Sequence, residues 1–263
     1  MAELTALDGL VVDLDGVVWV GTSAVPGSVA ALEQLRKRLR VVFVTNDPRG
    51  SRTDYVAQLR ALGIDADERE IVTSSSALAS LLADERRGST AFVIGSPALR
   101  AEVAAAGLPL LTDDAARDAE VVVVGGHAGF DYGELRLAGQ ALRRGAALFA
   151  TGRDAVFPMP DGPWPGTGAV LAAVETAGGK EATVVGKPEP LIFEHARSLL
   201  AECRRVAIVG DNLASDIVGG HRAGLTTILV LTGNATEADV EGAAFRPDVV
   251  LPDLAAVADA MAR

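Results

Sequence analysis

The sequence predicts an α/β protein with a parallel β-sheet, and three observations support this. Short apolar runs alternate with segments of helical periodicity, as at 10–12, 28–39, 41–44 and 51–62, which is typical of strand–helix units with right-handed crossovers. The runs are continuously apolar, which indicates strands buried on both faces. Polar loops follow three of them, at the carboxyl ends where parallel sheets bind their ligands.

Composition and charge narrow the class of protein. The 263 residues are 49% hydrophobic, enough for a large core in one or two domains. The net charge is −11 and no basic stripe occurs, so we expect no nucleic-acid partner. No stretch approaches the roughly 18 apolar residues of a membrane span, and no signal peptide is expected. The single Cys203 fits a reducing cytoplasm.

The first predicted strand carries the strongest chemical signal. Leu10–Val12 leads into Asp13, which should lie at the edge of the sheet, and Asp15 follows two residues later. Gly16 permits a turn too tight for a residue with a Cβ. Two carboxyls this close do not both ionise freely without a cation or a shared proton. The stretch therefore indicates either a divalent metal or an acid beside a base.

The next elements repeat this pattern. The strand at 41–44 ends in Thr45-Asn46-Asp47-Pro48, a polar loop at the same predicted edge. A second alternation follows, with helices at 74–87, 97–106 and 132–144 and strands at 91–94, 120–124 and 147–150. A loop rich in proline and glycine spans 152–168 and precedes a helix at 167–177.

The third portion begins with Gly186-Lys187-Pro188. A helix at 191–201 precedes a strand at 206–209, which ends in Gly210-Asp211 with Asp216 soon after. A short helix, a strand at 226–231, the apolar pair Val249-Val250 and a C-terminal helix complete the chain.

The polar residues at these strand ends form one predicted constellation. Oxygen ligands without histidine or thiolate suit a hard cation such as Mg²⁺, and a lysine acts on phosphate as a point charge. A hydroxyl and loop N–H groups can bind phosphoryl oxygens, so the set is equipped for phosphoryl transfer. Its members are Asp13, Asp15, Thr45, Lys187, Asp211 and Asp216.

The four motifs that carry these residues resemble, in order and spacing, those of the haloacid dehalogenase (HAD) superfamily, and the large insert resembles its NagD-like phosphatase branch. The resemblance implies a Rossmann-like parallel-sheet core formed by residues 1–72 and 184–263. An α/β cap would span residues 73–183. It also implies a Mg²⁺-dependent phosphatase that hydrolyses a small phosphomonoester through an aspartyl phosphate. The motifs are Asp13-Leu14-Asp15-Gly16-Val17, Thr45-Asn46, Gly186-Lys187-Pro188 and Gly210-Asp211 through Asp216-Ile217.

The resemblance also assigns roles position by position. Asp13 would attack phosphorus, and Asp15 would serve as general acid and then general base. Thr45, Asn46 and Lys187 would bind the phosphoryl group. The metal would be held by the Asp13 side chain, the Asp15 backbone carbonyl and the side chain of Asp211, with Asp216 orienting metal waters or Lys187.

Departures from the family pattern concern substrate recognition. Asp47 replaces the usual second Asn, so either it turns away and caps the next helix or its charge lowers the affinity for substrate. We expect the first, with Arg49 as a counter-charge. His127 and Arg153, in loops of the insert, are candidate specificity residues. The resemblance also implies a homodimer formed through the cap. Two rival functions remain open, namely a phosphotransferase or phosphomutase on the same core and a non-catalytic protein that binds a phosphorylated metabolite.

Overall fold

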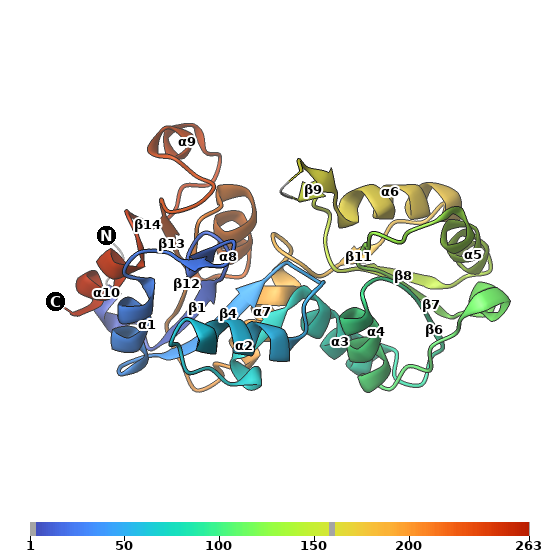
Figure 1. Cartoon of the computed structure of the whole chain (residues 1–263), viewed down its shortest axis with the longest axis horizontal. Helices are drawn as coiled ribbons and strands as arrows, with labels where there is room; N and C mark the ends of the chain where they lie inside the picture. The colour runs from blue at the N-terminus through green and yellow to red at the C-terminus, as the bar shows by residue number, and fades with distance from the viewer. Residues whose placement is uncertain (1–3, 158–160, 263) are drawn as a thin grey trace. The chain divides into compact units, whose positions relative to one another are not determined.

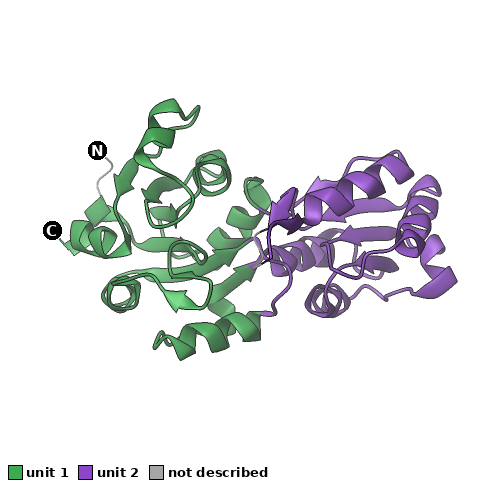
Figure 2. Ribbon diagram, turned by 45° about the horizontal axis from the view of Figure 1, so that its top comes forward, with its two compact units in different colours: residues 1–45, 52–72, 187–263 green, residues 46–51, 73–186 purple. Residues whose placement is uncertain are grey.

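The computed structural model describes residues 4–157 and 161–262, and the chain divides into two compact units (Figure 2). The first unit comprises residues 1–45, 52–72 and 187–263, and the second comprises 46–51 and 73–186. The second unit therefore continues beyond the expected boundary at residue 183, because β11 (Thr183–Val184) pairs with a strand of that unit. It also includes the segment 46–51, which the sequence analysis placed in the core.

The first unit is built on a six-stranded sheet (Figure 1). β1 lies inside it and pairs in parallel with β4 on one side and β12 on the other. Parallel pairing continues outward through β13 and β14, so the predicted parallel α/β sheet is confirmed. The strand order is β14 (Val249–Leu251), β13 (Thr226–Val230), β12 (Val206–Gly210), β1 (Gly9–Asp13), β4 (Arg40–Thr45) and β5 (Ile71–Thr73).

Helices cover both faces of this sheet. Leu10, Val12 and Phe43 belong to one buried cluster with side chains of α1 (Ser28–Arg36), α2 (Arg52–Ala61) and α10 (Leu254–Ala262). On the other face, α8 (Val218–Arg222) approaches α7 (Pro190–Ser198) and β12 so closely that Gly219 and Gly220 leave no room for a Cβ. This three-layer arrangement holds the carboxyl ends of the strands along one edge.

The second unit has its own four-stranded parallel sheet, in the order β11, β8, β7, β6. Figure 1 shows α5 (Tyr132–Arg143) and α6 (Thr167–Gly178) above it and α3 (Ser74–Glu85) and α4 (Pro97–Ala105) below it. The helices and strands that alternate between residues 74 and 150 thus belong to an α/β unit with helices on both faces of its sheet. Its remaining strands are β6 (Ala91–Ile94), β7 (Val121–Val124) and β8 (Ala147–Ala150).

Several short elements lie where the sequence predicted loops. β2 (Trp19–Val20) and β3 (Ser23–Ala24) form a hairpin after β1, and β9 (Val156–Phe157) pairs with β10 (Trp164–Pro165) inside the proline-rich loop. Positions 158–160 of that loop lie outside the described residues. α9 (Glu237–Gly242) follows β13. Across 4–157 and 161–262, no helix combines the length and the apolar composition that a bilayer crossing requires.

Candidate active site

Three neighbouring strands of the first unit deliver polar residues to the same edge of the sheet. Asp13 ends β1 and pairs with Val44 of β4, so that Thr45 follows directly beside it. Val12 pairs with Val209 of β12, so Gly210 and then Asp211 follow on the other side. The predicted convergence of Asp13, Thr45 and Asp211 therefore results from strand register, and all three are buried.

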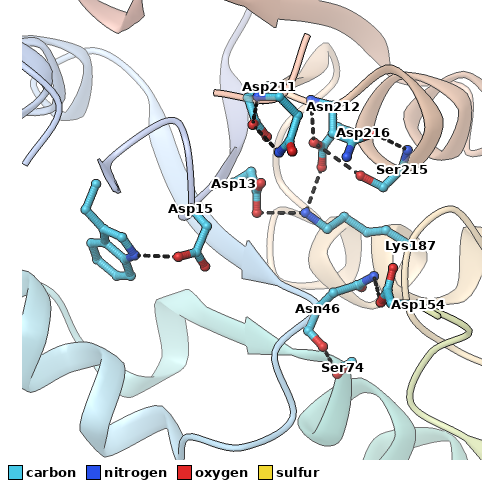
Figure 3. A network of polar contacts seen from close by, with 12 residues as sticks. Asp13, Asp15, Asn46, Ser74, Asp154, Lys187, Asp211, Asn212, Ser215 and Asp216 are labelled. Carbon is cyan, nitrogen blue, oxygen red and sulfur yellow. Dashed lines mark hydrogen bonds and ion pairs between the residues drawn. The ribbon is translucent and has the colours of Figure 1, made fainter. Parts of the chain in front are cut away.

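Lys187 joins this group from the loop before α7. Its Nζ donates to Asp13 Oδ1 and to Asp216 Oδ1, each at 2.7 Å (Figure 3). Burial alone would lower the pKa of this ammonium, but the carboxylates of Asp13 and Asp216 outweigh it and raise the pKa above its ordinary value. Lys187 is therefore a fixed positive charge between two carboxylates that lie far apart in the sequence.

Asp216 is fully buried and is held on both of its oxygens. Oδ1 receives Lys187, and Oδ2 accepts the backbone N–H of Asn212 at 3.1 Å. Asn212 in turn accepts N–H groups of Ala214 and Ser215, which fixes the turn after β12. These contacts are those that the expected orientation of Lys187 by Asp216 requires.

A carboxylate cluster forms around Lys187. Asp13, Asp211 and Asp216 each offer an oxygen within 4.8 Å of the others. Burial raises the pKa of Asp13 well above its ordinary value, and the charges of Asp216 and Asp211 raise it further against the opposing effect of Lys187. Burial followed by the charge of Asp216 likewise raises the pKa of Asp211, against the two hydrogen bonds from Asn234. Three carboxylates share one ammonium, so hard oxygen ligands with uncompensated charge are present, as a Mg²⁺ site needs.

Glycine and asparagine neighbours hold Asp211 in place. Asn234 donates its backbone and side-chain N–H groups to Asp211 Oδ2, both at 2.6 Å. Gly16 has a φ of +80° and lies so close to Asp211 that a Cβ would collide with the carboxylate. Thr232 donates its hydroxyl to the Gly16 carbonyl at 2.5 Å. Gly16 is thus required for the turn and for the approach of Asp211 to Asp13.

Asp15 occupies a different environment from Asp13. Its side chain is exposed, and its Oδ1 accepts the indole N–H of Trp19 at 3.0 Å (Figure 3). The side chain of Asp15 is not part of the carboxylate cluster around Lys187. Two carboxyls separated by a single residue are therefore placed differently, one buried on the lysine and one presented to solvent.

The segment that follows Thr45 belongs to the second unit. Ser74 donates its hydroxyl to the Asn46 carbonyl at 2.8 Å, and Asn46 Nδ2 lies 3.4 Å from Asp154 Oδ2. Ser96 donates to the Pro48 carbonyl at 2.8 Å. These hydroxyls explain why 46–51 groups with the second unit rather than with β4.

Asp47 does not cap the next helix, contrary to expectation, because α2 begins only at Arg52. It accepts the Arg49 backbone N–H at 2.9 Å, and the guanidinium of Arg49 binds both of its oxygens at 2.8 Å. The guanidinium carbon also lies 4.7 Å from the centre of the Phe157 ring. The counter-charge expected from Arg49 is present and forms a two-pronged ion pair.

The two candidate specificity residues bind carboxylates of the second unit. His127 Nδ1 accepts the Gly129 N–H at 3.2 Å, so its Nε2 carries the hydrogen that meets Glu134 Oε2 at 2.8 Å. Arg153 binds Glu175 with two contacts of 2.6 and 3.0 Å. Both side chains thus fix their own loops.

Sequence reasoning missed two donors at this site. Asn234 follows β13, so its place after a fourth strand at the same edge could have signalled a role. Nothing in the sequence marks the indole N–H of Trp19 as a partner of Asp15.

Two protein-family models match this chain. The family described as haloacid dehalogenase-like hydrolase matches residues 10–109, and a HAD-hydrolase-like family matches residues 184–257. Human chronophin is 40% identical over 259 residues, covering 92% of this chain and 88% of chronophin.

Solved structures give the same result. The p-nitrophenyl phosphatase from Archaeoglobus fulgidus has a TM-score of 0.90 at 32% identity, covering 97% of this chain and 99% of its own. The glycerol phosphate phosphatase from Mycobacterium tuberculosis, solved in complex with magnesium, has a TM-score of 0.90 at 35% identity, covering 98% of this chain and 78% of its own.

Proposed function

Because this chain belongs to the haloacid dehalogenase-like hydrolases and is a phosphomonoester hydrolase of the NagD-like branch, we propose that it cleaves a small phosphomonoester with Mg²⁺, using Asp13 as nucleophile. The single observation that carries the proposal is the placement of Lys187 between Asp13 and Asp216, beside Asp211. A merely structural ion pair would not need a third buried carboxylate within the same 4.8 Å.

The first half of the reaction transfers the phosphoryl group to the protein. A carboxylate oxygen of Asp13 attacks phosphorus while the bond to the leaving oxygen breaks, and the leaving oxygen takes its electron pair and a proton from Asp15. Lys187 and the Thr45 hydroxyl offset the charge on the phosphoryl oxygens, together with N–H groups around Asn46. The product of this half is an aspartyl phosphate on Asp13 and a free alcohol.

The second half regenerates the protein. A water molecule attacks phosphorus and loses its proton to Asp15, and the bond from phosphorus to the Asp13 oxygen breaks with its electrons returning to the carboxylate. Mg²⁺, held by Asp13, Asp211 and the backbone carbonyl of Asp15, would supply charge neutralisation at the phosphoryl oxygens. Asp216 keeps Lys187 oriented through both steps.

The test is a substrate panel in Mg²⁺ with the Asp13→Asn variant as blank. p-Nitrophenyl phosphate, glycerol phosphate and sugar phosphates cover aryl and alkyl esters, and released phosphate is measured for each. Acid quenching during turnover should trap a phosphoryl adduct on the peptide that contains Asp13. Absence of phosphate release above the blank from every ester would refute the proposal.

Two controls separate the rival functions. A phosphotransferase would pass the phosphoryl group to an added alcohol, so the panel is repeated with a large excess of glycerol and the phosphorylated acceptor is quantified. A non-catalytic binder would bind the same esters in wild type and in Asp15→Asn without turnover in either. The hydrolase predicted here binds in both and turns over efficiently only with Asp15 intact.

A further inference from the structure

The indole of Trp19 contacts the carboxyl of Asp15, and Trp19 has no part in the two reaction steps proposed above. Trp19 begins β2 and is only 2% exposed, within the main core of the first unit. An indole N–H can only donate, and a buried one needs an acceptor. Asp15 Oδ1 is that acceptor at 3.0 Å, the dashed line from Asp15 in Figure 3. A core aromatic ring is thus joined to an exposed carboxyl.

The backbone between these two residues is closed tightly. The Leu14 carbonyl accepts the N–H groups of Val17, Val18 and Trp19 at 3.3, 2.9 and 3.2 Å. The Gly16 N–H donates to the Trp19 carbonyl at 2.7 Å, so the turn is also bonded from its other side. The indole is fixed by the core and the backbone of Asp15 by this turn, so the N–H holds the carboxyl group of Asp15 in one orientation.

We propose that Trp19 is a positioning residue that orients Asp15 as the general acid. The inference rests on the proposed function and adds a residue to it. A rigid N–H donor pairs with the unprotonated oxygen of a carboxyl group, so a protonated Asp15 carries its hydrogen on Oδ2 and not on Oδ1. The indole therefore selects the oxygen that delivers the proton to the leaving oxygen as the bond from phosphorus breaks.

The chemistry of the leaving group gives a readout that packing does not move. An alkoxide leaving group needs the proton of Asp15 as the bond to phosphorus breaks, whereas p-nitrophenolate is stable without it. General acid catalysis contributes roughly 10²–10⁴-fold where it is needed. Loss of orientation should therefore slow alkyl esters much more than aryl esters, whereas a general loss of folded protein slows both by the same factor.

The experiment compares Trp19→Phe with wild type on glycerol phosphate and p-nitrophenyl phosphate. The kcat/KM ratio of the alkyl to the aryl ester should fall at least about tenfold, a part of the general-acid contribution. Trp164→Phe is the matched control, because it removes an indole N–H that also binds an aspartate, Asp161 at 2.9 Å. That variant should keep the wild-type ratio.

Further measurements distinguish the role of Trp19 from a folding artefact. An analogue of tryptophan with sulfur in place of the ring N–H, incorporated at position 19 alone, keeps the shape of the ring and removes only the donor. In an Asp15→Asn background, Trp19→Phe should add less than about twofold, since residues that act as one unit are not additive. Thermal unfolding and the Mg²⁺ dissociation constant from calorimetry report whether the first unit is intact.

The outcomes are separable. Equal losses on both esters, or an unchanged ratio with the sulfur analogue, would overturn the role of Trp19 and leave the phosphatase reaction standing. Absence of hydrolysis in the wild type would instead refute the proposed function. A selective loss on the alkyl ester that disappears in the Asp15→Asn background supports the inference.

Discussion

Replacing Lys187 by methionine tests the central charge arrangement, because it keeps most of the stem and removes the ammonium. In wild type, Nζ lies 2.7 Å from Asp13 and 2.7 Å from Asp216, and the side chain is 4% exposed. Breaking a buried pair on one side typically costs about 3–5 kcal/mol, because the remaining charges lose their partner. We expect that loss in the free energy of unfolding of the metal-free protein.

Mg²⁺ should reverse much of this loss. The variant leaves three neighbouring carboxylates without a cation, so its Mg²⁺ dissociation constant should be about tenfold lower than that of wild type. Turnover should nevertheless fall by about 10²–10³, the usual effect of removing one donor to a reacting phosphoryl or acyl group. Simple misfolding would not produce lower stability, tighter metal binding and slower turnover together in one variant.

The assay uses the two tryptophans, one in each unit. In a Trp164→Phe background the fluorescence of Trp19 reports the first unit alone, with and without EDTA. Lys37→Met is the matched control, since Lys37 makes an exposed pair with Glu33 at 3.2 Å and should cost less than about 0.5 kcal/mol. Unchanged stability of Lys187→Met in EDTA, or weaker Mg²⁺ binding, would refute the reasoning.

The sign of the pH dependence follows from the direction of the Lys187 shift. Its pKa is raised in the folded protein, so the pair contributes fully below the ordinary value near 10.5 and is lost only as the pH rises above it. Ionisation of Lys187 should therefore add no pH dependence, between pH 7 and 9, to the difference in unfolding free energy between wild type and Lys187→Met.

Three further predictions concern other residues. Gly16→Ala should weaken Mg²⁺ binding at least about tenfold and destabilise the first unit by more than about 1 kcal/mol, because its Cβ would displace Asp211; calorimetry and thermal unfolding measure both. Asp47→Asn should change kcat/KM by less than about threefold, because its arginine partner already neutralises the carboxylate, and a large gain would contradict this. The pKa of Glu175 is lowered from its ordinary value of 4.5 mainly by its hydrogen bond from Arg153, so Glu175→Gln should cost less than about 1 kcal/mol at pH 7. In chemical denaturation this cost should disappear as the pH falls from 4.5 through the lowered pKa.

The sheet edge could be predicted from sequence because parallel topology leaves little freedom. Once 10–12, 41–44 and 206–209 are strands of one parallel sheet, the residues after each must share an edge, and Asp13, Thr45 and Asp211 do. The haloacid dehalogenase family, predicted from the four motifs, is confirmed by family models that match residues 10–109 and 184–257.

The short strands could not be predicted, because their own sequences do not determine them. β5 is only Ile71–Thr73, and β11 only Thr183–Val184. Each is fixed by a neighbouring strand already in the sheet rather than by periodicity, which needs a longer window. The grouping of 46–51 with the second unit likewise depends on hydroxyls from Ser74 and Ser96, which no local pattern connects to that loop.

The substitution at Asp47 illustrates why a departure from a family motif must be judged with its neighbours. Considered alone, a carboxylate two residues after Thr45 should repel a phosphate dianion. The Arg49 backbone N–H and guanidinium satisfy both oxygens of Asp47, and the guanidinium also stacks against Phe157. The chemical unit at this position is therefore a neutral Asp–Arg pair, as an asparagine would be neutral, and Asp47 and Arg49 compensate each other. A motif that tolerates Asp in place of Asn should accordingly require arginine two residues later, because without it the charge of Asp47 would stand uncompensated on the loop that begins at Thr45.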